Sequence, residues 1–246
     1  MVLIGLCWAA LISHAISHSG NGHTPTASAS ASATFAMWTL MAVAMMAPTA
    51  VPVLISLRDI LRSQQTAAWW GFLAGYLAIW VAFGAIATVA QRLLATHGTI
   101  GHYGAATSRL FNATVFACAG AYQFTSLKRR CVTECVRPMT FFLRYWRAGT
   151  SGGIRMGARH GVSCLGCCWA LMLLAFVGGL TNVWWMVLCA ALMALEKVPA
   201  TSRYITVPLG LTLIGAGCIA LFVPATSTHD HQNHHSMSIE STKGTA

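Results

Sequence analysis

Apolar residues are gathered into long uncharged runs, and the charged residues lie between them. Four runs, at 35–57, 67–90, 110–127 and 204–223, each approach the roughly 20 apolar residues that a membrane-spanning helix needs. A fifth uncharged run extends over 161–195. It is too long for one helix of ordinary tilt and just long enough for two short ones.

Turn-forming residues lie near the middle of this fifth run. Gly178-Gly179 is followed closely by a threonine and an asparagine, a combination typical of turns. We therefore expect two helices, over 161–177 and 183–198. The alternative is a single long helix, which would reverse the orientation of everything that follows it.

The amino-terminal segment 1–16 is apolar but has no basic residue before it. It is either a first helix or the apolar part of a signal peptide, for which the Ser/Ala-rich stretch 27–33 offers a cleavage region. We expect an uncleaved helix. The fold class is then all-α, a polytopic transmembrane bundle of about seven helices, or six if the first is removed. An outer loop at 17–34 precedes the bundle at 35–223, and a disordered His-rich tail at 224–246 follows it.

Composition supports a membrane protein and excludes several other classes. The chain is 56% apolar and 8% charged, against about 25% charged residues in soluble domains. A water-exposed globule, a disordered chain and a coiled coil are excluded on this ground. The net charge of +10 does not indicate a nucleic-acid partner, because long uncharged runs separate the basic residues.

The basic residues predict an orientation. The segment 128–160 holds eight of the fifteen Lys and Arg residues, and such segments lie in the cytoplasm. This places the amino terminus inside and the carboxy terminus outside. Nine of the ten histidines then fall on or near the outer side, and five clustered cysteines fall at the cytoplasmic face.

Potential metal ligands are densest in the segment 160–168. On a helix, His160, Cys164 and Cys167 lie within about 60° of one another, and Cys168 extends the arc to about 100°. Thiolate and imidazole suit Cu(I) and Zn(II). We therefore expect a metal or redox site here, although a single buried cysteine is more often a packing residue.

A second cysteine pair follows the basic triplet 128–130. Cys131 and Cys135 have helical i, i+4 spacing, and the neighbouring cations are expected to lower the pKa of these thiols. The pair reaches Cys164 and Cys167 if the loop folds back on the bundle. The alternative is that the arginines are membrane anchors and the pair is incidental.

Methionines recur in the run 35–57. Met37, Met41 and Met45 share one helical face with Pro48 and Pro52. Such a stripe is more often flexible packing than a ligand path. Two facts favour a ligand path here: thioether binds Cu(I), and prolines free carbonyl groups that a cavity or a bend must accommodate.

Acidic residues are scarce, with five in the chain. Glu196, at an expected helix end in the membrane, is a candidate for balancing charge at the site. The alternative is an ion pair with Lys197 or with an arginine of the basic segment. No phosphate loop or nucleophile motif is visible, so the sequence does not point to an enzyme.

These motifs resemble a bacterial family of predicted metal-binding integral membrane proteins, sometimes described as copper chaperones. The resemblance covers about 35–220, and its most specific part is Cys164-Leu-Gly-Cys167-Cys168-Trp169. Further matches are Trp38 with the methionine and proline pattern, Gly75-Tyr76, Tyr122-Gln123, the Cys131/Cys135 pair, His160-Gly161 and Glu196-Lys197. Two departures are the position of Arg137 and a serine at 163 in place of an aromatic residue.

We therefore expect a copper-binding protein of the bacterial cytoplasmic membrane that transports Cu(I) or delivers it to a partner cuproprotein. The expected ligands are the five clustered cysteines with His160, Met41 and Met45. Zinc stays open as the alternative metal. Two other functions also stay open: a membrane thiol–disulfide oxidoreductase, and a non-catalytic subunit or assembly factor of a membrane complex.

Overall fold

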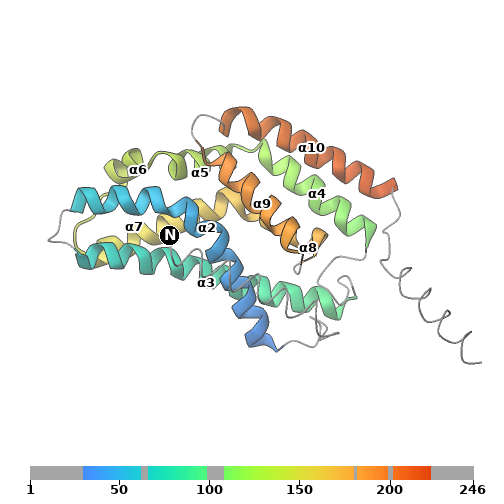
Figure 1. Ribbon diagram of the computed structural model, residues 1–246, viewed down its shortest axis with the longest axis horizontal. Coiled ribbons are helices and arrows are strands. Elements are labelled where there is room, and N and C mark those ends of the chain that lie inside the picture. Colours follow the sequence, from blue (N-terminus) through green and yellow to red (C-terminus); the bar gives the residue numbers. More distant parts are fainter. Residues whose placement is uncertain (1–29, 62–65, 99–107, 180–181, 199–201, 223–246) are drawn as a thin grey trace, which may run out of the picture.

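A computed structural model describes residues 30–61, 66–98, 108–179, 182–198 and 202–222. Every regular element in these ranges is a helix (Figure 1). The helices are α2 (Ala31–Leu61), α3 (Thr66–Thr96), α4 (Arg109–Gln123), α5 (Ser126–Val136), α6 (Pro138–Tyr145), α7 (Gly149–Leu173), α8 (Ala175–Gly178), α9 (Val183–Glu196) and α10 (Ser202–Phe222). The expected first helix, the tail 224–246 and nearly all of the outer histidines lie outside the described residues.

Four helical stretches of the described chain are long and apolar enough to cross a membrane. They are Ala31–Leu61, Thr66–Thr96, Gly149–Gly178 and Tyr204–Phe222. α4 has 15 residues and α9 has 14, and at about 1.5 Å per residue both fall short of a hydrocarbon core about 30 Å thick. The all-α class is confirmed, and four of the expected spans are supported.

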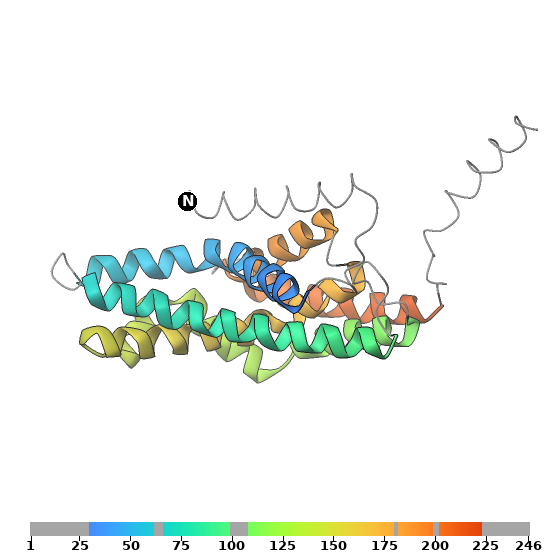
Figure 2. The ribbon, with the colours of Figure 1, turned by 90° about the horizontal axis from the view of Figure 1, so that it is seen from below.

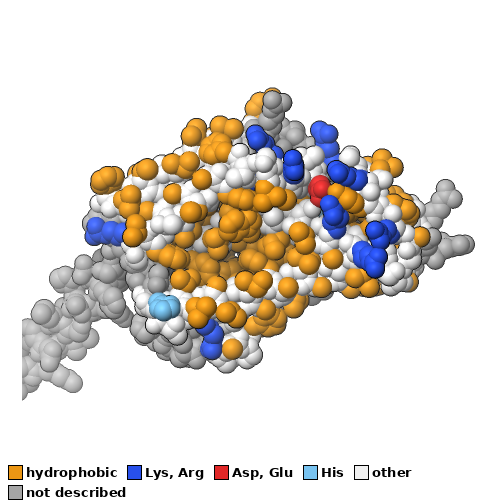
Figure 3. Space-filling view, turned by 180° about the vertical axis from the view of Figure 1, so that it is seen from behind, with side chains coloured by type: hydrophobic (Ala, Val, Ile, Leu, Met, Phe, Trp, Pro, Cys, Tyr) orange, Lys and Arg blue, Asp and Glu red, His pale blue; other side chains and the backbone are white. Residues whose placement is uncertain are grey.

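The outer surface is strongly apolar. Large apolar side chains point outward from several helices, among them Trp70, Ile86, Trp184 and Phe222. Figure 3 shows hydrophobic side chains over the middle of one face, with most of that face's Lys and Arg side chains at one end. A soluble monomer rarely exposes so much contiguous apolar surface, and this surface suits contact with lipid.

The basic segment 128–160 differs from the expected loop because most of it is helical. It contains α5, α6 and the first turns of α7. Thr125 caps α5 by accepting the backbone N–H of Lys128, and Pro138 occupies the first turn of α6, where proline is well tolerated. Lys and Arg are also good helix formers. The arginines therefore mark exposed helix faces and not an irregular connection, whereas Lys128 is buried.

Close backbone contact joins α3 to α7. α3 packs along both α2 and α7, and the three helices lie in layers in Figure 2. A Cβ atom added at Gly157 would overlap the carbonyl of Phe72, and one added at Gly75 would overlap the carbonyl of Ile154. Small residues at such crossings let membrane helices approach closely. This contact fixes α7, which carries most of the clustered cysteines.

Two predicted irregularities are confirmed. The chain leaves the helix after Gly178, where Gly179 has φ of 85°, and Asn182 then caps α9 by accepting the N–H of Trp185. The run 161–195 is therefore two helical regions. In Figure 1, α2 bends midway along its length, and Pro48 and Pro52 lie inside this helix.

Candidate metal centre

Three thiols from two helices meet beside the bend of α2. Cys135 comes from α5, and Cys164 and Cys167 come from successive turns of α7. Their Sγ atoms lie within 4.8 Å of one another, and the Sγ atoms of Cys135 and Cys167 are 3.9 Å apart. Both α7 cysteines are buried, and Cys135 is half-buried.

These separations suit a soft metal ion. A metal ion binds thiolate sulfur at about 2.3 Å, so three sulfur ligands in a trigonal arrangement lie about 4.0 Å apart. The 3.9 Å between Cys135 and Cys167 matches that spacing. The group could hold a metal ion with little movement of the helices.

Met46 of α2 adds a fourth sulfur atom. Its Sδ lies 3.9 Å from Cys164 Sγ and 3.6 Å from Cys168 Sγ. Met46 is fully buried, and Thr49, one turn later, donates a hydrogen bond of 2.8 Å to its carbonyl. Met46 was not among the expected ligands, because it lies outside the stripe of every fourth residue.

An ammonium group enters the centre from the end of α9. Lys197 Nζ lies 3.2 Å from Cys164 Sγ, 3.3 Å from Met46 Sδ and 3.0 Å from Thr49 Oγ1. An ammonium has three donors, and each has an acceptor here. The sequence offered Lys197 only as a partner for Glu196, and nothing in its spacing indicated contact with sulfur.

Glu196 forms an ion pair with Lys128 and not with the neighbouring Lys197. Both of its carboxylate oxygens lie 2.8 Å from Nζ of Lys128, and the pair is almost completely buried. The alternative to charge balancing, an ion pair with Lys197 or an arginine of the basic segment, is therefore replaced by a pair with Lys128 that ties α5 to the end of α9.

Polar contacts hold both α4 and α5 against α7. Tyr122 donates its hydroxyl hydrogen bond to the carbonyl of Gly166, and Ser163 donates one to the Glu134 carboxylate. A Cβ atom at Gly166 would lie 2.7 Å from Cys131 Sγ, so this glycine makes room for α5. Of the two cysteines that were within reach of the bundle if the segment folded back, Cys135 joins the α7 thiols and Cys131 does not.

Cys131 lies half-buried on Gly166, outside the three-thiol group. Burial raises the pKa of its thiol, and Cys167 and Glu134 act in the same direction. The expected lowering of the Cys131 pKa by neighbouring cations is therefore wrong. Arg129 and Arg130 point to solvent, and Lys128 is paired with Glu196.

His160 is buried among aromatic rings one turn before Cys164. Its ring centroid lies 5.9 Å from those of Phe72 and Tyr76 and 5.3 Å from that of Phe141. Nδ1 has no hydrogen-bond partner among the described residues. The structure does not bring His160 into the three-thiol group.

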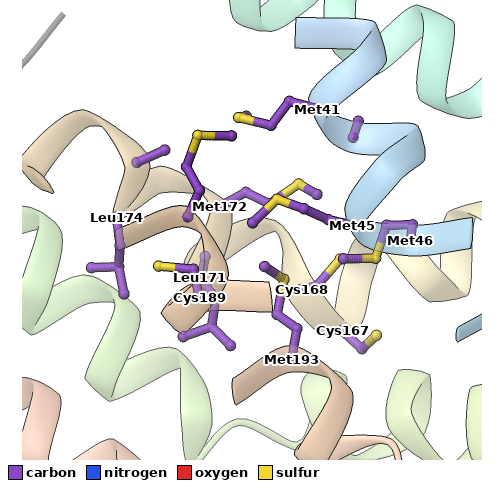
Figure 4. Packing of buried hydrophobic residues seen from close by; sticks show 14 of the residues in the cluster. Met41, Met45, Met46, Cys167, Cys168, Leu171, Met172, Leu174, Cys189 and Met193 are labelled. Carbon is purple, nitrogen blue, oxygen red and sulfur yellow. The ribbon is translucent and has the colours of Figure 1, made fainter. Parts of the chain in front are cut away.

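The remaining candidate ligands line the adjoining core. Met41 and Met45 are buried in one cluster with Cys168, Met172 and Met193. Figure 4 shows their sulfur-bearing side chains in a continuous series that leads from Met41 to Met46 and Cys167. The predicted methionine face thus borders the thiols but does not reach them through Met41 or Met45.

Comparison with known proteins places the chain in a family. A family model described as copper chaperone, PpoB2, matches residues 35–220. No curated protein and no solved structure matches the chain. The matched range contains every residue of the centre described above. It also agrees with the family resemblance of the sequence motifs over about 35–220. This chain belongs to the PpoB2 copper chaperone family.

Proposed function

We propose that this protein binds Cu(I) through Cys135, Cys164, Cys167 and Met46 and passes the ion to a cuproprotein partner. The observation that carries the proposal is the meeting of three thiols within 4.8 Å. Copper is the cargo in this proposal, and binding it displaces protons from the thiols.

The donor set favours copper over zinc. Thioether sulfur is a soft donor that suits Cu(I), whereas the usual donors of zinc sites are thiolate, imidazole and carboxylate. The fourth donor near the thiols is Met46, with its Sδ 3.9 Å from Cys164 Sγ. His160 packs among aromatic rings, and the Glu196 carboxylate is bound to Lys128.

The sulfur atoms beside the three thiols provide a route for the ion. We assign Met41, Met45 and Cys168 to weaker, transient ligation on the way to the three thiols. Cys131, half-buried against Gly166 of α7, is assigned to the exchange with a partner. His160 supports the α7 cysteines by its packing.

The proposed location is the bacterial cytoplasmic membrane, with the thiols at the cytoplasmic face. The support is the concentration of Lys and Arg around α5, α6 and the start of α7, together with the preference of such segments for the cytoplasm. The partner would then collect or deliver copper on that side.

The test is the metal content of the detergent-purified protein from copper-supplemented cells. We expect near-stoichiometric copper in the parent and its loss in a Cys164→Ser/Cys167→Ser variant. The matched control is Cys118→Ser, which replaces an exposed cysteine of α4. Equal copper in the parent and the double variant would contradict the proposal.

A thiol–disulfide oxidoreductase is the second candidate. The observation in its favour is the 3.9 Å between the Sγ atoms of Cys135 and Cys167, since a modest movement would bring them to the bonding distance of about 2.05 Å. This function requires a mixed disulfide with a substrate protein, trappable in a Cys135→Ser variant, and no bound metal.

A further inference from the structure

A fixed positive charge lies in contact with the proposed ligands. Lys197 Nζ is 3.2 Å from Cys164 Sγ and 3.3 Å from Met46 Sδ. Because a metal ion binds thiolate at about 2.3 Å, the ammonium lies within about 5.5 Å of any ion bound to Cys164. Any such ion is repelled by this charge.

Neither of the two neighbouring carboxylates forms an ion pair with the Lys197 ammonium. Glu196 directs both oxygens to Lys128, at 2.8 Å. Glu134 accepts hydrogen bonds from Ser163 and Tyr145. Within the described residues, the hydrogen-bond acceptors of the Lys197 ammonium are the two sulfur atoms and the Thr49 hydroxyl.

We propose that Lys197 restricts the sulfur centre to monovalent metal ions. This inference rests on the proposed function and adds the class of ion that the site accepts. Coulomb repulsion is proportional to the charge of the ion, so a divalent ion is penalised twice as much as a monovalent one.

The size of the effect follows from the distance. At about 5 Å and an effective dielectric constant of about 20, one extra unit of charge on the ion costs about a hundredfold in affinity. Lys197 is half-buried, and solvent screening reduces the effect toward about tenfold. Removing the charge should therefore lower the preference for Cu(I) over Zn(II) by about 10-fold to 100-fold.

The experiment compares Cu(I) and Zn(II) affinities of the full-length protein in detergent, under anaerobic conditions, by competition with a colorimetric chelator. Lys197→Gln and Lys197→Met remove the charge. Lys197→Arg keeps it, and Thr49→Val removes the hydroxyl, with its hydrogen bonds to the Met46 carbonyl and from Lys197 Nζ, without changing charge. Gel filtration and thermal melting establish that each variant is folded.

We expect the ratio of Cu(I) to Zn(II) affinity to fall by about 10-fold to 100-fold in both neutral variants and to stay within about threefold in the other two. An unchanged ratio in a neutral variant that still binds Cu(I) contradicts this inference alone. An equal fall in Lys197→Arg also contradicts it, because geometry and not charge would then be the cause. A parent that binds no Cu(I) contradicts the proposed function itself.

Discussion

Lys128 and Glu196, 68 residues apart in the chain, form a buried ion pair in which both carboxylate oxygens lie 2.8 Å from the ammonium nitrogen. Lys128 lies on α5, two turns before Cys135, and Glu196 immediately precedes Lys197. The pair therefore links the helix that brings the third thiol to the residue that brings the ammonium.

Breaking this pair should destabilise the protein and disturb the centre. Lys128→Met leaves the Glu196 carboxylate buried without a partner, at a cost of about 3–5 kcal/mol. The double variant Lys128→Met/Glu196→Leu removes both charges and should recover most of that loss. Thermal melting in detergent gives the comparison, and a double variant no more stable than the single one would contradict this role.

The α3–α7 contact predicts a second stability effect. Gly157→Ala adds a methyl group where the carbonyl of Phe72 lies, so the helices must separate, and we expect a loss of about 1–3 kcal/mol. Gly215→Ala in α10 is the control, because its Cβ meets nothing within 4 Å and alanine favours a helix by up to about 1 kcal/mol. Melting temperatures that fall equally in both variants would contradict the close contact.

Met46 should matter more for copper than the methionines of the predicted stripe. Met46→Leu keeps volume but removes the thioether 3.9 Å from Cys164 Sγ. We expect Cu(I) affinity to fall by roughly tenfold, the equivalent of about 1.4 kcal/mol. Met139→Leu, at an exposed position of α6, is the control.

Met41→Leu should have a smaller effect than Met46→Leu, because Met41 lies at the opposite end of the sulfur series from Met46 and Cys167 (Figure 4). The measurement is Cu(I) competition against a chelator. An equal loss of affinity in the two variants would mean that the stripe, and not Met46, supplies the fourth ligand.

The thiol of Cys131 should react slowly near neutral pH. Burial raises its pKa, so the thiolate, which is the reactive form, becomes abundant only at higher pH than for a free cysteine. Alkylation of Cys131, followed by peptide mass spectrometry of the metal-free protein, should show a rate profile displaced to higher pH than that of glutathione. Glu134→Gln removes one contributing charge and should move the profile back toward lower pH.

Hydropathy and local motifs predicted most of the long helices, because a long apolar helix can be recognised from the residues of its own segment alone. The break at Gly178-Gly179 and the prolines inside α2 were visible for the same reason. The helical nature of the basic segment was missed, because a high density of charge was interpreted as a loop when it marks the exposed faces of α5 and α6.

The centre was predicted in part. Helical spacing placed Cys164 and Cys167 on one face, and their contact with Cys135 was foreseen as a possible consequence of the loop folding back. Met46, Lys197 and the Lys128–Glu196 pair depend on how α2, α5 and α9 pack around α7. Helix rotation and crossing are set by long-range contacts that the order of residues in one segment does not reveal.

X-ray absorption spectroscopy of the copper-loaded protein tests the central claim most directly. The proposal predicts Cu(I) bound by sulfur atoms alone, three thiolates and the Met46 thioether, at about 2.3 Å, with the sulfur signal reduced in Cys164→Ser/Cys167→Ser. A shell made mainly of nitrogen or oxygen ligands, or an unchanged spectrum in that variant, would contradict it.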